Sequence, residues 1–163
     1  MKKIALLGVT VLTIFLFTAC NYSSASKKEA SKHVTNWDET TKTFTSEDGV
    51  LKIDGVDETK NYKGKPAIKI NFTLTNKKVK PVNVRTLVMS MMKVQQKTIN
   101  IMNDLKDAKL IDNFENHLRN NLNTNETITG NCSYILDTES DPIQIQFMVY
   151  MFSPPVATYD VSL

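Results

Sequence analysis

The sequence predicts an all-β domain, built as a two-sheet sandwich of about six to eight strands and preceded by an export signal. After residue 44, apolar and polar residues alternate in several short segments, which is typical of half-buried strands. Turn-forming residues separate these segments at intervals of roughly 8 to 15 residues. A small barrel is the competing all-β architecture.

Residues 1–19 have the composition of a secretory signal peptide. Two lysines precede an apolar stretch that runs to Phe17, and small residues follow it up to Ala19. A membrane-spanning helix needs about 20 apolar residues, which is more than this stretch contains. We therefore predict that the signal is removed by cleavage between Ala19 and Cys20.

The residues at the predicted cleavage site, Phe17-Thr18-Ala19-Cys20, resemble the lipobox of bacterial lipoproteins. In that family the cysteine thiol receives a diacylglycerol and the cysteine becomes the first residue, although Leu is usual where this chain has Phe17. The resemblance implies a chain held by a lipid on Cys20 at the extracytoplasmic face of the bacterial cell membrane. Each buried methylene contributes about 0.8 kcal/mol, so two acyl chains anchor stably. The alternative is an ordinary signal peptide followed by a chance cysteine.

The charge balance of the chain does not indicate a nucleic-acid-binding surface. The formal net charge is +3 at pH 7, and removal of the two leader lysines lowers it to +1. Nucleic-acid binding needs a clustered basic face, so we predict no nucleic-acid partner. The membrane is the predicted partner, through the lipid on Cys20, together with a protein or peptide whose identity the sequence leaves open.

A polar segment separates the predicted cleavage site from the folded domain. Residues 20–43 are rich in Ser, Lys, Thr and Glu, with few apolar side chains to bury, and are predicted to form a flexible tether. Val34 and Trp37 are exceptions that could begin a first strand. The sandwich domain is predicted over residues 44–163.

The predicted strands follow one another along this domain. The clearest covers residues 67–75, where apolar and polar residues alternate strictly, so that the apolar ones share one face. Similar patterns predict strands over 50–56, 82–95, 127–137, 143–150 and 157–161. Within 82–95, residues 87–92 are apolar on both faces, so the register is open and we expect a bulge.

The stretch 104–121 is ambiguous in the sequence. Its apolar residues fit one helical stripe, but Asp and Asn, which favour turns over helix interiors, are frequent between them. We predict a short helix or a structured loop, inserted between strands of the sandwich. The residues on the helical stripe are Leu105, Leu110, Ile111, Phe114, Leu118 and Leu122.

The strand over 67–75 also carries a family resemblance. Residues 62–77 read YKGKPAIKINFTLTNK and are similar to the immunoglobulin-like domains of the DUF5067 and DUF4352 type, found in lipoproteins and secreted proteins of low-GC Gram-positive bacteria. Residues 125–136 resemble a later strand of these domains, with Asn125-Glu126 where Pro-Gly is usual. The resemblance covers residues 50–163 and implies an immunoglobulin-like sandwich in an extracytoplasmic setting, without implying an activity.

Residues able to carry chemistry are few. Zinc sites need closely spaced His or Cys ligands, whereas the chain has His33, His117 and, beyond Cys20, only Cys132, so no metal or other cofactor is predicted. Cys132, His117 and an Asp could be drawn as a catalytic triad. Cys132 falls on the inward phase of its strand, however, and a buried core cysteine is the favoured interpretation. We therefore predict that the chain is not an enzyme.

The predicted function is a non-catalytic binding or adaptor module for an exported protein, a peptide or a wall component. The candidate binding face consists of Gln144, Gln146, Met148 and Tyr150, which share the outward phase of a strand. The alternative is an enzyme, or an enzyme inhibitor, that uses the insertion 104–121, because long loops often carry function. A fragment of the leader acting as a secreted signalling peptide is a third possibility.

Overall fold

The computed structural model describes residues 35–110 and 117–163. The predicted signal peptide 1–19, Cys20, His33 and the tether up to residue 34 lie outside the described residues, as do residues 111–116 of the predicted insertion. In the part of the chain that the structure describes, no helix is long and apolar enough to cross a membrane.

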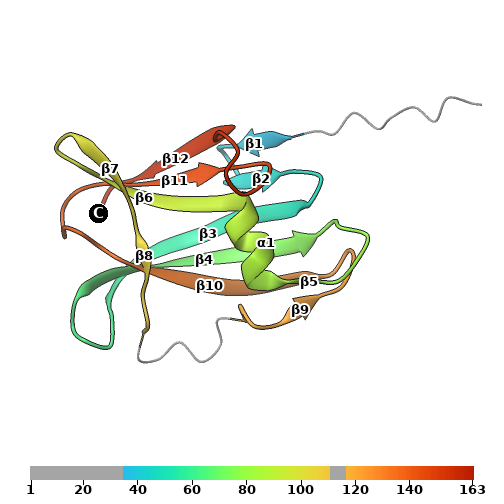
Figure 1. Cartoon of the computed structure of the whole chain (residues 1–163), viewed down its shortest axis with the longest axis horizontal. Coiled ribbons are helices and arrows are strands. Elements are labelled where there is room, and N and C mark those ends of the chain that lie inside the picture. The colour runs from blue at the N-terminus through green and yellow to red at the C-terminus, as the bar shows by residue number, and fades with distance from the viewer. Residues whose placement is uncertain (1–34, 111–116) are drawn as a thin grey trace, which may run out of the picture. The chain divides into compact units, whose positions relative to one another are not determined.

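Two antiparallel sheets pack face to face around one hydrophobic core (Figure 1). The large sheet has the strand order β1-β2-β3-β4-β10-β8, the small sheet β12-β11-β6-β7, and a third sheet pairs β5 with β9. The strands of the large sheet are Asn36–Asp38 (β1), Thr43–Thr45 (β2), Gly49–Lys60 (β3), Pro66–Asn76 (β4), Thr127–Ile135 (β10) and Lys106–Asp107 (β8). The others are Ala157–Val161 (β12), Ile143–Phe147 (β11), Met92–Thr98 (β6), Ile101–Asp104 (β7), Val82–Asn83 (β5) and Asn121–Leu122 (β9).

The all-β sandwich predicted from the sequence is confirmed, with 12 strands in the described residues where about six to eight were expected. The difference comes from strands of two to four residues at the edges of the sheets, which are too short to show an alternating pattern. The longer strands β3, β4, β10, β11 and β12 lie where alternation predicted them. An immunoglobulin-like assignment stays a prediction.

Strand β4 lies at the centre of the core. The alternating residues Ile68, Ile70, Phe72 and Leu74 face the small sheet and are fully buried. On the opposite face, Thr73 donates a hydrogen bond of 2.7 Å to the Asp54 carboxylate of β3. Full burial of such an apolar side chain stabilises the fold by roughly 1.5–3 kcal/mol. The buried residues of β4 are Ala67, Ile68, Ile70, Phe72, Leu74 and Asn76.

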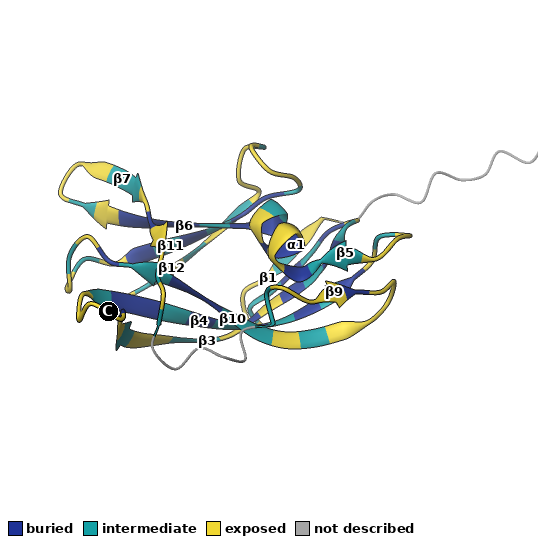
Figure 2. Cartoon of the chain, turned by 60° about the horizontal axis from the view of Figure 1, so that its bottom comes forward, coloured by how far each residue is buried: buried dark blue, intermediate teal, exposed yellow. Residues whose placement is uncertain are grey.

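The prediction of a strand over 82–95 is wrong in its first half, which forms helix α1 (Val84–Met91) before β6 begins. The Asn83 side chain caps this helix by accepting a hydrogen bond of 3.3 Å from the backbone N–H of Thr86. The buried residues of α1 recur at helical spacing and face the core (Figure 2): Val84, Leu87, Val88 and Met91. Over so few residues, the same apolar run also fits a strand, and that ambiguity misled the sequence prediction.

The predicted tether 20–43 extends too far into the folded domain. Asn36–Asp38 forms β1 and pairs with β2, so the ordered domain includes residues 36–43. The physical reason is Trp37, whose indole stacks on the ring of Phe147 with centroids 4.2 Å apart. An aromatic side chain with a large area to bury holds this short strand on the sheet.

The described residues of the predicted insertion 104–121 form no helix. Asp104 ends β7, Lys106–Asp107 forms β8 against β10, and Asn121 begins β9. The predicted helical stripe does not form because its residues belong to separate parts of the fold. The backbone N–H of Leu105 donates to the carbonyl of Val94 in β6, whereas Leu122 lies in β9. The structured-loop alternative therefore holds for the described part, while Ile111 and Phe114 lie outside it.

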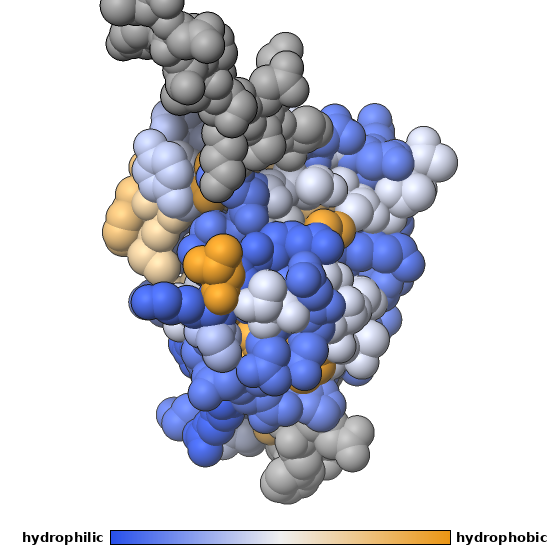
Figure 3. Space-filling view, turned by 90° about the vertical axis from the view of Figure 1, so that its right-hand side faces the viewer, coloured by the Kyte–Doolittle hydropathy of each residue, from blue (hydrophilic) through white to orange (hydrophobic). Residues whose placement is uncertain are grey.

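The N-terminal segment joins the domain at one end of the sandwich. In the strand register, Asn36 at the start of β1 lies opposite Thr45 of β2, and Thr45 is linked through β3 to Thr75 of β4. The start of β1 therefore lies at the same end of the large sheet as the end of β4. We call it the tether end: the start of β1, the turn 77–80 after β4, and the loop 148–156 after β11. Figure 3 looks onto this side, where apolar patches interrupt a mostly hydrophilic surface.

Candidate functional site

The candidate site is a groove between helix α1, the end of the small sheet, and strands β8 and β10. It consists of two adjoining cavities of about 510 Å³ and about 630 Å³. Met89, Asp107 and Tyr134 line both cavities and mark their boundary. We call the two together the α1 groove, and the volume of each cavity lies in the range of ligand-binding pockets.

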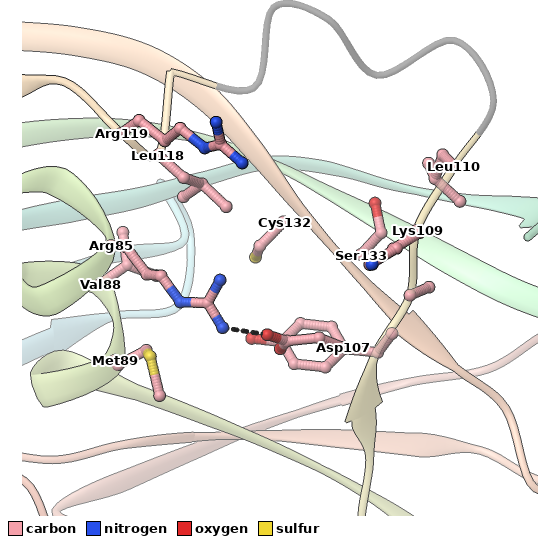
Figure 4. A pocket seen from close by; sticks show the side chains of 12 residues that line it. Arg85, Val88, Met89, Asp107, Lys109, Leu110, Leu118, Arg119, Cys132 and Ser133 are labelled. Carbon is pink, nitrogen blue, oxygen red and sulfur yellow. Dashed lines mark hydrogen bonds and ion pairs between the residues drawn. The ribbon is translucent and has the colours of Figure 1, made fainter.

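The first cavity has a charged mouth (Figure 4). Arg85 on the exposed side of α1 forms an ion pair with Asp107 of β8, which crosses the opening of the cavity. Lys109 and Arg119 also line this cavity, so its lining residues include three basic side chains and one acidic side chain. The mouth therefore suits a ligand with a negative charge, and an arginine offers the planar geometry that carboxylates prefer.

Cys132 and Tyr134 of β10 form the inner wall of this cavity. Burial raises the pKa of the Cys132 thiol from 9.0 to about 12, opposed by a hydrogen bond with Tyr134 and reinforced by the negative charge of Asp107. Burial likewise raises the pKa of Tyr134 well above its usual value, with Cys132 adding to the effect. A thiol is nucleophilic only as thiolate, so Cys132 acts here as a small apolar wall residue.

The second cavity is lined by methionines. Met92 and Met148 are buried at its base, while Met89 and Met151 are partly exposed at 44% and 38%. Phe152 also lines it, held in the left-handed region at φ 71°. Methionine side chains are flexible and polarisable, so they adapt to apolar ligands of different shape.

The rim of the second cavity carries a hydrogen-bonded row of polar side chains. Gln146 of β11 donates to the Gln95 amide oxygen at 2.8 Å, and Gln95 donates to Asp104 at 2.6 Å. Lys93 forms an ion pair of 2.8 Å with the same carboxylate. Hydrogen bonding from Lys93, then from Gln95, holds the pKa of Asp104 below its usual value, so the rim keeps a negative charge at neutral pH.

The predicted binding face is divided by the end of strand β11. Gln144 and Gln146 lie on its outward face and share a hydrogen bond of 3.0 Å. The strand ends at Phe147, so Met148 turns inward and is buried, while Tyr150 is exposed in the following loop. Gln146 and Met148 therefore line the second cavity, whereas Gln144 and Tyr150 do not.

The other sequence candidates do not meet in the groove. Cys132 lines the first cavity beside Asp107, but His117 is not among the lining residues and its ring contacts Asn120 instead at 3.3 Å. Within 35–110 and 117–163, no group of three His, Cys, Asp or Glu side chains could hold a metal ion. Sequence reasoning missed Arg85 and Asp107, because neither the helix nor the pairing of β8 was predicted.

The most specific part of the family motif has a structural role. Asn76 at the end of β4 is fully buried, and its side-chain amide donates to the carbonyls of Leu122 at 2.9 Å and Lys80 at 3.1 Å. Its amide oxygen accepts from the backbone N–H of Lys78 at 2.9 Å. Asn76 thus joins the turn 77–80 and β9 to the large sheet, and neither Thr75 nor Asn76 lines the α1 groove.

Fold and groove together define a small all-β sandwich module with a candidate ligand-binding surface. The chain belongs to the DUF5067 family, a domain of unknown function, which matches residues 23–149. This confirms the DUF5067 part of the predicted resemblance, while the DUF4352 part stays a prediction. No curated protein matches the chain.

Solved structures of similar fold come from Gram-positive bacteria. A candidate lipoprotein of Staphylococcus aureus subsp. aureus NCTC 8325 has a TM-score of 0.69 and 17% identity, over 80% of this chain and 92% of its own. A protein of Enterococcus faecalis has a TM-score of 0.66 and 26% identity, over 80% and 94%. The candidate lipoprotein ycdA of Bacillus subtilis subsp. subtilis str. 168 has a TM-score of 0.57 and 16% identity, over 76% and 39%. These likenesses support the fold, and the family has no assigned activity.

Proposed function

We propose that this chain is a lipid-anchored cell-surface protein whose sandwich domain binds a peptide segment of an exported protein in the α1 groove. Residues 1–19 serve as the signal peptide, Cys20 carries the lipid, and the domain is exposed on the extracytoplasmic face of the membrane. The lipobox-like sequence at Cys20 and the candidate lipoproteins of the same fold support the anchor.

The observation that carries the binding role is the pairing of two unlike cavities in one groove. The first has a basic mouth at Arg85, Lys109 and Arg119, and the second is lined by methionines with Phe152. A peptide with an acidic group beside large apolar side chains matches both cavities at once. Binding surfaces of this kind combine buried apolar anchors with a polar rim.

No arrangement among the described residues favours catalysis over binding. Cys132, the one nucleophilic candidate, is buried as a neutral thiol with a pKa of about 12. The described parts of 104–110 and 117–121 contribute lining residues such as Asp107 and Arg119 rather than a set of acid and base groups. The enzyme and inhibitor alternatives therefore have no specific observation in their favour.

The anchor is tested by comparing the wild type with Cys20→Ala. Membrane fractionation and intact mass should show a wild-type chain in the membrane, beginning at Cys20 and carrying a diacylglyceryl mass. The variant should lose that mass and appear in the medium or remain uncleaved. A wild-type chain secreted without the lipid mass would overturn the anchor.

The groove is tested with the purified lipidated protein in detergent and a library of short fluorescent peptides. Peptides that combine acidic and apolar residues should bind, and Met89→Glu should weaken that binding by placing a negative charge between the cavities. Lys69→Glu, on the solvent face of the large sheet, is the matched control and should bind as the wild type does. Equal binding by both variants, or no selected peptide, would contradict the proposal.

A further inference from the structure

Exposed apolar side chains gather on the loops of the tether end. Phe152 and Tyr150 in the loop 148–156 are 91% and 62% exposed, Val156 in the same loop is 51% exposed, and Val79 in the turn 77–80 is 89% exposed. Isolated exposed apolar residues are common on soluble proteins. The four residues of the tether end are not isolated in this sense, because two separate loops place them near the point where the chain enters the domain.

The loop 148–156 holds Phe152 in a conformation that bulky residues rarely adopt. Its φ of 71° lies in the left-handed region. The turn is closed by a hydrogen bond of 3.0 Å from the backbone N–H of Ser153 to the carbonyl of Tyr150. Strained backbone is kept mainly where it serves a function, and here it points an aromatic side chain into solvent.

The turn 77–80 places lysines around its exposed apolar residue. Lys77 and Lys80 are exposed on either side of Val79, and Lys78 forms an ion pair of 2.6 Å with Asp48. Glu47 and Asp48 are the acidic residues on the neighbouring turn between β2 and β3. An apolar tip flanked by exposed lysines is the arrangement that favours the headgroup region of an anionic bilayer.

The proposed anchor keeps this end of the domain within reach of the membrane surface. This step rests on the proposed lipid on Cys20. Fully extended, the chain from Cys20 to Asn36 spans at most about 55 Å, and it joins the domain at the tether end. The exposed residues Ile99 and Ile101 lie on the β6–β7 hairpin at the opposite end of the domain. The distance between the two ends is comparable to the length of the 11-residue strand β4, which is about 36 Å.

From this geometry we infer that the tether end is seated on the outer surface of the anionic cell membrane. Phe152 and Val79 enter the headgroup region, and Lys77 and Lys80 contact lipid phosphates. The domain then stands with the β6–β7 hairpin away from the membrane. The α1 groove, whose second cavity shares Phe152 with the loop, opens beside the lipid surface, within reach of exported proteins as they leave the membrane.

The test uses the lipidated full chain reconstituted in vesicles of phosphatidylcholine and phosphatidylglycerol that contain nitroxide-labelled lipid. Phe152→Cys and Val79→Cys carry a thiol-linked fluorophore at the tether end, and Ile99→Cys carries it at the opposite end as the matched control. Cys20 is consumed by the lipid and Cys132 is buried, so the chain without an introduced cysteine should take no label. Two probe positions are used so that a local structural change caused by one substitution does not decide the result.

The expected result is quenching several-fold stronger at positions 152 and 79 than at position 99, with the difference reduced when phosphatidylglycerol is omitted. Equal quenching at the two ends, or none at either, would overturn the inference while leaving the anchor intact. Flotation of the vesicles is measured in the same samples. Protein that does not float with the vesicles would overturn the anchor itself and, with it, this orientation.

Discussion

The indole of Trp37 stacks on the ring of Phe147, with centroids 4.2 Å apart and planes 25° from parallel. Trp37 lies in β1 of the large sheet and Phe147 ends β11 of the small sheet, so the contact joins the two layers of the sandwich. Phe44 of β2 stacks on the same ring with centroids 5.3 Å apart. The first strand of the domain is therefore held by aromatic packing as well as by its short ladder with β2.

Trp37→Ala should lower the free energy of unfolding by about 2–4 kcal/mol, because it removes a large, partly buried side chain and its aromatic contacts. Denaturant unfolding followed by circular dichroism measures the loss, since Trp37 is the one tryptophan of the chain and its fluorescence disappears with it. Trp37→Phe keeps a ring on Phe147 and should cost less than half as much. An alanine variant as stable as the wild type would show that β1 contributes nothing to the fold.

The sequence predicted strands well where one face of the strand is buried and the other is exposed to solvent. β4, with its four apolar residues at alternate positions, is the clearest case. Sequence alone did not predict α1, because Val84–Met91 has two helical turns of apolar spacing that also fit a strand. Asn83 as a helix cap was the signal that could have decided between them.

The groove was less predictable than the strands. Arg85 and Asp107 are 22 residues apart and meet only because β8 pairs with the edge of β10 opposite α1. Such a meeting depends on tertiary packing, and a short strand such as β8 leaves no pattern in the sequence. Cys132 was correctly placed on the inward phase of its strand and is buried, although Ser133 beside it is buried as well, so burial does not alternate through all of β10.

Gly49→Ala should lower the free energy of unfolding by about 1–3 kcal/mol, because β4 and α1 pack against the start of β3 with no room for a side chain. A Cβ at Gly49 would lie 2.7 Å from the Thr75 carbonyl oxygen and 3.3 Å from the Met91 sulfur. Gly55→Ala is the matched control: its nearest neighbour would be 4.0 Å away, so its stability should change little. Equal effects of the two substitutions in denaturant unfolding would refute the close packing of β4 and α1 around Gly49.

Gln96→Ala should lower the free energy of unfolding by about 2–4 kcal/mol, because this buried amide fixes the acidic turn at 137–141. Its oxygen accepts from the backbone N–H groups of Asp137 and Thr138, and its nitrogen donates to the carbonyls of Thr138 and Asp141.

The control for this substitution is Gln144→Ala, which removes an amide that bonds Asp160 on the outer face of the small sheet. It should change the stability by less than about 0.5 kcal/mol. Both variants are compared by thermal and denaturant unfolding. A harmless Gln96→Ala would mean that water replaces all four hydrogen bonds, and that the turn does not depend on this residue.

Cys132 should be unreactive toward thiol reagents in the folded protein at pH 8 and should react promptly once the chain is unfolded. The reason is burial, which raises the pKa of the thiol from 9.0 to about 12 and denies the reagent access. Above about pH 9 the unfolded chain releases the thiol proton while the folded chain keeps it, so stability should fall as the pH rises from 9 toward 12. Cys132→Ser, whose hydroxyl does not ionise in this range, should show a smaller alkaline loss of stability. Rapid labelling of the folded wild type at pH 8 would contradict this account and would reopen Cys132 as an accessible thiolate in the α1 groove.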